Sequence, residues 1–149
     1  MGNMNVKPAD GKLGVLCVGL GAVTSTFMTG VLMARKGLAK PVGSMTQYDK
    51  MRVGRGENKK YLHYGEIVPL ADLKDIVFGA WDVYPANAYE SAINAEVLKE
   101  RDINPVKDEL EKIVPMKAAF DKKFASRLEG DNVKQCKNRW DMMEQVRED

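Results

Sequence analysis

The feature that most constrains the fold is a short apolar run that ends in two closely spaced glycines and continues as a helical pattern. Residues 12–18 read Lys-Leu-Gly-Val-Leu-Cys-Val, which is typical of a strand buried on both faces of a parallel sheet. Gly19 and Gly21 interrupt this run. Apolar residues then recur at spacings of three and four, as on one face of a helix: Val23, Phe27, Val31 and Ala34. The order of strand, glycine turn and helix predicts the first half of a βαβ unit.

The glycine turn also favours a phosphate site. A phosphate binds bare backbone N–H groups at a helix start, where side chains would block its approach. Gly19 permits the tight turn, and Gly21 lets a pyrophosphate come close. The third position of the G-x-G-x-x-G pattern is Thr24 rather than Gly or Ala, so the match is imperfect. A strand-to-helix turn that binds no ligand is the alternative interpretation.

An acid usually follows such a turn by about 20 residues and binds the ribose hydroxyls of a dinucleotide. Residues 40–47 contain no acid, and the first one after the turn is Asp49. Asp82 is the better candidate, because it follows the apolar run 76–81 at the carboxyl end of a predicted strand. A helix N-cap is an equally good interpretation of Asp82 from its local sequence.

The remaining patterns predict further helices and one more strand end. The first helix should end near Arg35, with Gly37 as its left-handed cap. Residues 67–68 could end a strand before Pro69, and residues 85–101 are predicted to form a helix. Asn104 is predicted to cap another helix. A last helix is expected from about Asn132 to residue 149 without a stop signal, which suggests a truncated chain.

Composition narrows the function classes. The chain has 149 residues, 44% of them apolar, and a formal net charge of +2, so one globular domain is expected and no nucleic-acid partner. The longest apolar run, 13–23, is too short to span a bilayer, and no secretory signal precedes it, so we expect a cytoplasmic protein and no membrane partner. His63 is the only histidine, which gives little support to a metal site or a His–Cys nucleophile pair.

A cluster of cations follows the first helix. Its members could grip a 2′-phosphate or a substrate phosphate: Arg52, Arg55, Lys59 and Lys60. A solvated loop is the simpler interpretation of the same residues, because runs of charge usually face water.

Several segments, in order along nearly the whole chain, resemble the inositol-3-phosphate synthases, particularly their bacterial and archaeal branch. They are residues 6–18, the turn 19–26, residues 35–44, 46–47, 67–82 and 87–90, Pro115-Met116 and residues 119–121. Two departures from the family pattern stand out: Ala80 occupies a position that is usually Gly, and Thr24 adds bulk after the turn.

The resemblance implies NAD as cofactor and the conversion of glucose 6-phosphate into inositol 3-phosphate. In that reaction NAD oxidises the substrate, enolisation and an aldol closure follow, and the retained NADH reduces the product. The resemblance assigns Asp82 to the adenosine ribose. It assigns six residues to the pyrophosphate turn: Gly19, Leu20, Gly21, Ala22, Val23 and Thr24. The family's catalytic lysines and substrate-phosphate pocket lie beyond residue 149, so no catalytic residue is assigned here.

The sequence therefore predicts an α/β fold, a partial Rossmann-type parallel sheet flanked by helices. Residues 1–149 are expected to form the amino-terminal NAD-binding domain, without the catalytic and tetramerisation part, of an enzyme that is a homo-oligomer in its family. Two alternatives stay open: the cofactor domain of an ordinary NAD(P)-dependent dehydrogenase, and a non-catalytic nucleotide-binding module. The bare chain is expected to lack catalytic activity.

Overall fold

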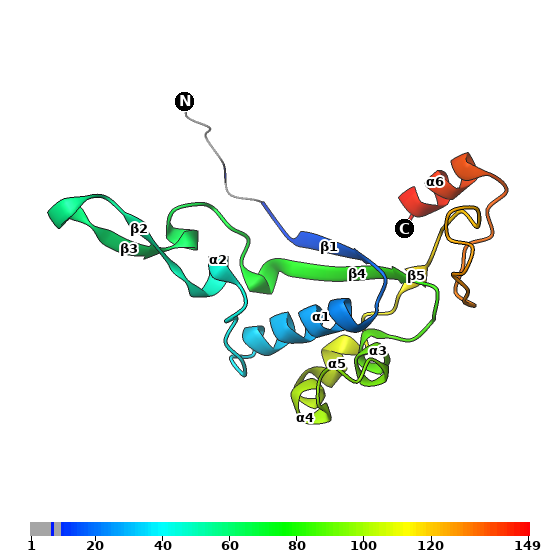
Figure 1. Ribbon diagram of the computed structural model, residues 1–149, viewed down its shortest axis with the longest axis horizontal. Coiled ribbons are helices and arrows are strands. Elements are labelled where there is room, and N and C mark those ends of the chain that lie inside the picture. The colour runs from blue at the N-terminus through cyan, green and yellow to red at the C-terminus, as the bar shows by residue number, and fades with distance from the viewer. Residues whose placement is uncertain (1–6, 8–9) are drawn as a thin grey trace. The chain divides into compact units, whose positions relative to one another are not determined.

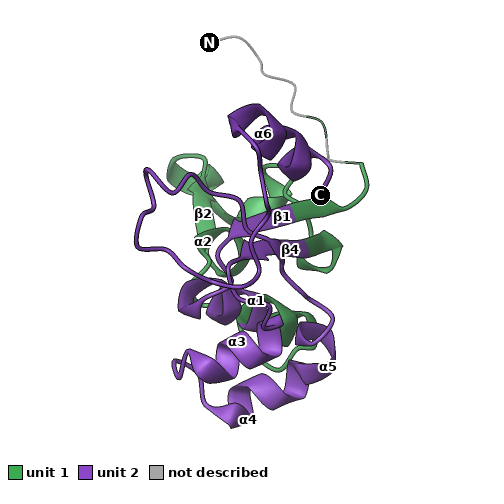
Figure 2. Cartoon of the chain, turned by 90° about the vertical axis from the view of Figure 1, so that its right-hand side faces the viewer, with its two compact units in different colours: residues 1–14, 30–77 green, residues 15–29, 78–149 purple. Residues whose placement is uncertain are grey.

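A computed structural model describes residue 7 and residues 10–149 of the chain (Figure 1). The chain divides into two compact units. Unit 1 comprises Met1–Gly14 and Gly30–Val77, and unit 2 comprises Val15–Thr29 and Phe78–Asp149 (Figure 2). Three elements begin in one unit and end in the other: β1 (Leu13–Val18), α1 (Ala22–Arg35) and β4 (Ile76–Asp82).

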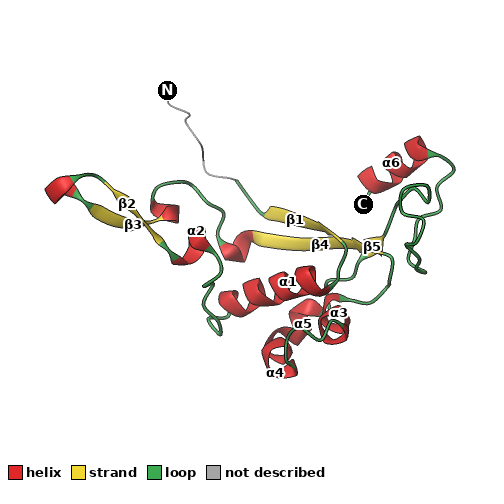
Figure 3. Ribbon diagram, in the orientation of Figure 1, coloured by secondary structure: helices red, strands yellow, loops and turns green. Residues whose placement is uncertain are grey.

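Unit 2 is built around a three-stranded parallel sheet flanked by helices (Figure 3). Its strands lie in the order β1 (Leu13–Val18), β4 (Ile76–Asp82) and β5 (Met116–Lys117). β4 pairs with β5 in parallel, with Trp81 opposite Met116 and Asp82 opposite Lys117. The predicted α/β fold with a Rossmann-like sheet is therefore confirmed. The predicted strands at 12–18 and 76–81 are also confirmed, whereas the two-residue β5 carried no signal in the sequence.

Helices cover one side of this sheet in both views (Figures 1 and 2). They are the first half of α1 (Ala22–Arg35), α3 (Ala88–Asn94), α4 (Glu100–Ile103) and α5 (Lys107–Leu110). Phe27 of α1 meets Phe78 of β4 edge-on, with ring centroids 5.6 Å apart. The buried apolar side chains of unit 2 come from these helices, from β4 and from the turns that connect them: Leu20, Met28, Ala80, Val83, Ala88, Ala92, Ile103, Val106 and Leu110.

The buried face of α1 differs from the predicted one. Val23 is 85% exposed, whereas Ser25, Met28 and Thr29 are at most 2% exposed. The Thr29 hydroxyl donates to the Ser25 carbonyl at 2.7 Å, and the Ser25 hydroxyl donates to the Ala22 carbonyl at 3.3 Å. Because these bonds satisfy both hydroxyls within the helix, burying them leaves no unpaired polar group. A prediction from the spacing of apolar residues could not identify this buried face, because two of its residues, Ser25 and Thr29, carry hydroxyl groups.

The prediction that the first strand is buried on both faces is wrong for this chain. Leu16 is 62% exposed and Val18 is 91% exposed. The cause is the arrangement of the layers: α1, α3, α4 and α5 lie on one face of the sheet, and Leu16 and Val18, which alternate with the half-buried Val15 and Cys17, lie on the opposite face. Next to Leu16 on β4 stands Gly79, where a Cβ atom would lie only 2.8 Å from Leu16 Cδ2.

The predicted helix over 85–101 is shorter and broken in the structure. α3 begins at Ala88 with Asn87 as its N-cap, and a residue with positive φ, Glu96 at 53°, separates it from α4. Asn104 is not the predicted N-cap: it ends α4 and opens a 3₁₀ turn, Asn104–Val106, that leads into α5. Its side chain instead accepts a hydrogen bond from the Tyr89 hydroxyl at 3.1 Å. The Asn104 side chain thus bonds to Tyr89 of α3 instead of capping a helix.

The last helix begins later than predicted. α6 spans Arg139–Arg147, and its N-cap is Asn138, whose side chain accepts from the Asp141 N–H. The residues from Asn132 onward form an extended segment with a parallel bridge between Ala118 and Val133. Backbone pairing with the chain after β5 therefore outweighs the helical spacing of the side chains in this segment.

Unit 1 contains a hairpin that the sequence did not predict. β2 (Lys50–Val53) pairs antiparallel with β3 (Lys60–His63), and a short helix, α2 (Met45–Tyr48), precedes them. Three 3₁₀ turns lie at Gly56–Asn58, Tyr64–Glu66 and Leu73–Asp75. The expected strand end at 67–68 does not form, since the Ile67 and Val68 N–H groups both donate to the Tyr64 carbonyl in a turn.

The predicted cap of α1 is confirmed. Gly37 has a φ of 68°, its N–H donates to the Ala34 carbonyl, and the Leu38 N–H donates to the Met33 carbonyl. No helix within the described residues has the length and apolar character needed to cross a membrane.

Candidate functional site

The glycine turn joins β1 to α1 at the carboxyl end of the sheet. Gly19 has a φ of 95°, which favours glycine, and its N–H donates to the Trp81 carbonyl at 2.8 Å. Gly21 is exposed, and a Cβ atom built on it meets no atom within 4 Å. The turn therefore leaves open space in front of the first turn of α1, where the backbone N–H groups have no acceptor within the helix.

The structure brings Asp82, at the end of β4, to this turn. One carboxylate oxygen, Oδ2, accepts from the Leu20 N–H at 2.5 Å, and the other, Oδ1, accepts from the Tyr84 N–H at 2.9 Å. The N-cap interpretation of Asp82 is wrong, because Asn87 caps α3. We call Gly19–Gly21 together with Asp82 the glycine corner.

The other residues assigned to the turn lie in the same part of unit 2. Leu20 is buried at 2% exposure, Ala22 is the first residue of α1, Val23 is exposed and Thr24 is half-buried. Thr24 does not come within 4 Å of a Cβ atom built on Gly21, so it leaves the space at Gly21 open. Ala80, the second departure from the family pattern, is fully buried in β4. Its extra methyl group is accommodated in the core rather than at the corner.

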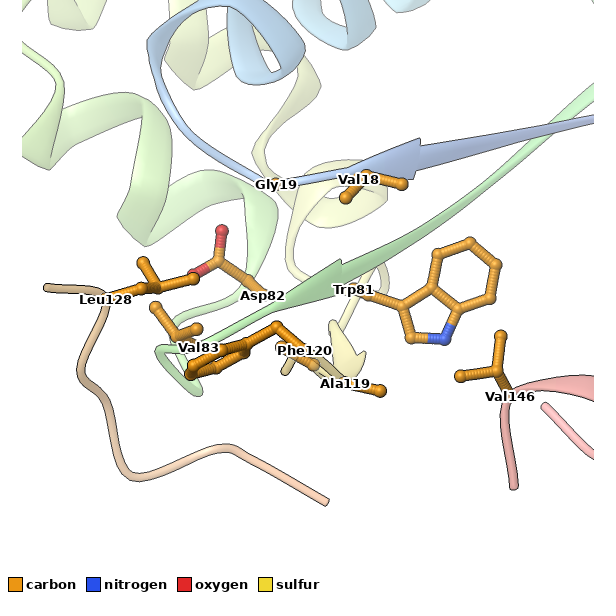
Figure 4. Close-up of a pocket in the computed structure, with 10 residues that line it drawn as sticks. Val18, Gly19, Trp81, Asp82, Val83, Ala119, Phe120, Leu128 and Val146 are labelled. Carbon is orange, nitrogen blue, oxygen red and sulfur yellow. The ribbon is translucent and has the colours of Figure 1, made fainter. Parts of the chain in front are cut away.

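An apolar cavity of about 380 Å³ borders the glycine corner. Figure 4 shows the Asp82 carboxylate directed toward the chain at Gly19, with the Trp81 indole and the Phe120 ring on the walls. The lining residues all belong to unit 2: Val18, Gly19, Trp81, Asp82, Val83, Ala118, Ala119, Phe120, Leu128 and Val146. Its volume and its few polar groups are typical of small-molecule sites.

A charged pair lies next to the Trp81 wall. The Lys134 ammonium donates to Asp149 Oδ1 at 2.8 Å, and the Trp81 indole N–H donates to Asp149 Oδ2 at 2.6 Å. The hydrogen bond from Lys134 lowers the pKa of Asp149, partial desolvation raises it, and the bond from Trp81 adds to the lowering. These bonds hold the indole by its polar edge and leave its ring for the cavity.

The glycine corner fits a dinucleotide by the chemistry of its donors and acceptors. An ionised carboxylate has about four lone-pair sites, and two of those on Asp82 are used by Leu20 and Tyr84. The remaining two match the two hydroxyls of a ribose. The N-terminus of α1, a helix of 14 residues, offers its N–H groups and the positive end of its dipole to a pyrophosphate.

The cations that the sequence singled out lie in unit 1, on the hairpin. Arg52 is in β2, Lys60 is in β3, and Arg55 and Lys59 lie in the connection between them. All four are exposed, and His63 is exposed at the end of β3. No group of three or more potential metal ligands among His, Cys, Asp and Glu occurs in the part of the chain that the structure describes.

Unit 1 has a cavity of its own, of about 520 Å³, with polar walls that include Gln47, His63 and Asp72. Arg35 also lines it, but its guanidinium donates to the Leu73 and Ile76 carbonyls, so it holds the chain that leads into β4. Lys74, another cation of these walls, forms an ion pair with Asp72 at 3.4 Å.

Sequence reasoning missed two residues that act on the glycine corner, Gly130 and Asn132. The amide of Asn132 donates to the Asp82 carbonyl at 3.0 Å, and Gly130 lies against Val83. The sequence Gly-Asp-Asn at 130–132 is a turn signal that could have argued against a helix there. It carries no hint of its distant partner, which is 50 residues earlier in the chain.

Comparison with known proteins adds independent information. An NAD-binding family model described as myo-inositol-1-phosphate synthase matches residues 13–149. The chain is 57% identical over 145 residues to inositol-3-phosphate synthase 1 of Bacteroides thetaiotaomicron, covering 97% of this chain and 33% of that protein. It is 30% identical over 154 residues to inositol-3-phosphate synthase of Trypanosoma brucei brucei, covering 93% of this chain and 29% of that protein.

The fold is also similar to a solved structure, that of inositol-3-phosphate synthase from Caenorhabditis elegans. The TM-score is 0.78 at 24% sequence identity, and the match covers 95% of this chain and 31% of that one. The chain thus spans about a third of the length of the curated relatives that it matches.

Proposed function

The chain belongs to the myo-inositol-1-phosphate synthase family, whose NAD-binding domain its residues match, and we propose that residues 1–149 form such a domain with the glycine corner as its cofactor site. NAD is the cofactor of this domain family. The observation that carries the proposal is the hydrogen bond from the Leu20 N–H to the Asp82 carboxylate. It joins the two parts that a dinucleotide site needs, although they are 62 residues apart in the sequence.

Each residue of the corner has a role in this proposal. The pyrophosphate lies over the turn and the first N–H groups of α1, at Gly19, Leu20, Gly21, Ala22, Val23 and Thr24. Asp82 accepts hydrogen bonds from the adenosine ribose, and the apolar cavity beside it shelters the adenine ring from water. The open space at Gly21 supports the first role, and the two unused lone-pair sites of Asp82 support the second.

The whole enzyme's activity belongs to the same proposal. We infer conversion of glucose 6-phosphate into inositol 3-phosphate, in which NAD when bound accepts a hydride and later returns it. The residues of this chain bind and orient the cofactor, and the resemblance places the catalytic lysines outside the matched segments. A homo-oligomer, a tetramer in the family, a cytoplasmic location and a role in phospholipid biosynthesis are further parts of the proposal. The comparisons favour neither an ordinary dehydrogenase nor a non-catalytic nucleotide-binding module.

Binding of cofactor fragments tests which end of NAD the corner holds. Calorimetric titration of the 149-residue chain should give similar dissociation constants for NAD and ADP-ribose, because both carry the pyrophosphate and the adenosine ribose. Nicotinamide mononucleotide, which lacks both the pyrophosphate and the adenosine, should show no saturable binding. Tighter binding of nicotinamide mononucleotide than of ADP-ribose would contradict the assignment of Asp82 to the adenosine end.

An activity assay tests whether this chain binds the cofactor without supplying the catalytic groups. Enolisation and aldol closure need a base and a cationic group at the developing oxyanion, each worth orders of magnitude in rate. We therefore expect no inositol phosphate when the purified chain is incubated with NAD and glucose 6-phosphate, measured by mass-resolved chromatography. Sustained product, in a preparation free of full-length enzyme, would require catalytic groups among these residues and would contradict the proposed role.

A further inference from the structure

Residues Gly130–Asn132 form a short segment that crosses the ends of β4 and β5, and Asn132 bonds to both strands. Its side-chain amide donates to the Asp82 carbonyl at 3.0 Å and to the Met116 carbonyl at 3.3 Å. Its N–H donates to the Val83 carbonyl at 2.9 Å, and its carbonyl accepts from the Ala118 N–H at 3.0 Å. One residue thus contributes four hydrogen bonds where the two strands end. We call residues 130–132 the Asn132 segment.

The Asn132 segment lies so close to Val83, the residue that follows β4, that only glycine fits at its start. A Cβ atom on Gly130 would stand 2.3 Å from the Val83 carbonyl oxygen and 2.6 Å from Val83 Cβ. Both are far shorter than any van der Waals contact, and the first involves backbone that cannot move aside. Leu128, two residues before the segment, lines the cavity beside the glycine corner (Figure 4). The segment therefore packs directly against the residue that follows Asp82.

The strand pairing alone gives the Asp82 end of β4 little support. β5 has only two residues, and Asp82 is part of the last pair of its ladder with β4. The Asp82 carboxylate holds the glycine turn through Leu20, while its own backbone carbonyl is held by the amide of Asn132. A shift of the Asp82 backbone would displace the carboxylate directly, whereas the turn is also held by the hydrogen bond from the Gly19 N–H to the Trp81 carbonyl.

We propose that Asn132 is a positioning residue that holds Asp82, and through it the glycine turn, in the geometry that selects NAD. The inference rests on the proposed function, in which Asp82 binds the adenosine ribose. Asn132 acts at a distance from the cofactor: its amide meets backbone carbonyls, and its effect reaches the ligand through the Asp82 side chain. Loss of the amide should therefore weaken the contact with the ribose hydroxyls more than the contact with the pyrophosphate.

The test compares NAD with NADP, because the 2′-phosphate of NADP replaces a hydroxyl that Asp82 would otherwise bind. For Asn132→Ala we expect the NAD dissociation constant to rise about tenfold and that of NADP to change less than about threefold, so that the preference for NAD narrows. Asn138→Ala is the matched control. Asn138 belongs to the same stretch of chain and caps α6, but its side chain bonds to Asp141 rather than to β4. It should leave the ratio of the two dissociation constants unchanged.

A double-mutant cycle distinguishes positioning from a general structural role. If Asn132 acts through Asp82, then Asn132→Ala should have no further effect on NAD affinity in an Asp82→Ala background. Two results would each overturn the inference. One is an equal loss of NAD and NADP affinity, which leaves the ratio of the two dissociation constants unchanged, and the other is additive effects of the two substitutions in the cycle. Should Asn132→Ala fail to fold by circular dichroism, Asn132→Asp keeps the side-chain shape and replaces the donor by an acceptor, and the same comparison applies to it.

The outcome for the wild-type chain separates this inference from the proposed function. If the wild type binds no NAD, the proposed function fails. If the wild type binds NAD with a preference over NADP that Asn132→Ala does not narrow, only the role of Asn132 fails.

Discussion

The glycine corner of unit 2 and the hairpin of unit 1 use polar groups in opposite ways. The hairpin carries four exposed cations, Arg52, Arg55, Lys59 and Lys60, on strands and a connection that face solvent. The glycine corner carries one acidic side chain, Asp82, and its other polar groups are backbone N–H donors fixed by the turn and by α1.

The difference shows that recognition depends on orientation more than on the number of charges. Exposed lysine and arginine side chains lose conformational freedom when they bind, and salt screens their charge. Backbone donors at a helix N-terminus are already fixed, so binding a phosphate there costs little further ordering. We therefore expect substitutions in the glycine corner, and not in the hairpin, to change NAD affinity.

The largest effect is expected at Gly21. Gly21→Ala places a methyl group where the pyrophosphate should approach, and NAD affinity should fall about a hundredfold, or about 2.7 kcal/mol. Stability should not fall, because Gly21 has no positive φ and the new Cβ would meet no atom within 4 Å. Calorimetry and thermal unfolding measure the two quantities on the same sample.

Gly19→Ala is the control for that result. Gly19 has a φ of 95°, so a side chain there is strained, and unfolding free energy should fall by about 1–3 kcal/mol. Loss of stability in Gly21→Ala, or unaltered NAD affinity in it, would contradict the assignment of the open space to the pyrophosphate.

A smaller loss is expected at Asp82. Asp82→Asn keeps the shape of the side chain but removes the charge that strengthens its hydrogen bonds, and NAD affinity should fall about tenfold, or about 1.4 kcal/mol. The matched control is Asp49→Asn, which changes the first acid after the turn in the sequence. Asp49 is exposed in unit 1, and its variant should bind NAD as the wild type does. A loss of NAD affinity in Asp49→Asn with no loss in Asp82→Asn would contradict the assignment of Asp82 to the ribose and would assign Asp49 to it.

The sequence predicted those parts of the corner that depend on local geometry. Gly19, Gly21 and the cap at Gly37 are positions where backbone conformation or close approach restricts the residue, so each is visible from its neighbours alone. Asp82 was found because it ends an apolar run, which places it at the carboxyl end of a strand.

What the sequence did not predict depends on distant partners. β5 has only two residues and forms because β4 lies beside it. The segment at Asn132 has helical spacing, yet bonds to Val83 and Ala118 hold it extended. The hairpin of β2 and β3 has no alternation strong enough to distinguish it from a polar loop. In each of these three regions the secondary structure depends on backbone pairing with a distant segment, which a local sequence pattern does not predict.

Acid should weaken both units slightly. The Lys123 N–H and then the Arg139 guanidinium lower the pKa of Asp121 in unit 2 below its ordinary value of 3.8, and the Lys74 N–H lowers that of Asp72 in unit 1. Because these pKa values are lower in the folded state, their stabilisation is complete above the unfolded value and is lost as the pH falls through the folded value.

Thermal unfolding between pH 5 and pH 2, a range of about three pH units around these carboxyl groups, measures that loss. Asp121→Asn should flatten the dependence at its acidic end, and the effect should be small because its ion-pair partner Arg139 is largely exposed to solvent. A steeper fall in the variant than in the wild type would contradict the direction given for Asp121.

The smallest effect is expected on the hairpin. Replacing Arg55 and Lys59 together by alanine should change NAD affinity less than about twofold, because neither side chain belongs to the glycine corner. A tenfold loss of NADP affinity in this double variant would assign the cations to a 2′-phosphate and reverse the comparison between the two regions.

The most direct test of the central claim is the ratio of the NAD and NADP dissociation constants of the wild-type chain, measured by calorimetry at one salt concentration. If Asp82 binds the ribose hydroxyls, its negative charge repels a 2′-phosphate, and NAD should bind at least about tenfold more tightly. Equal or tighter binding of NADP would contradict the assignment of Asp82 and of the glycine corner as an NAD site.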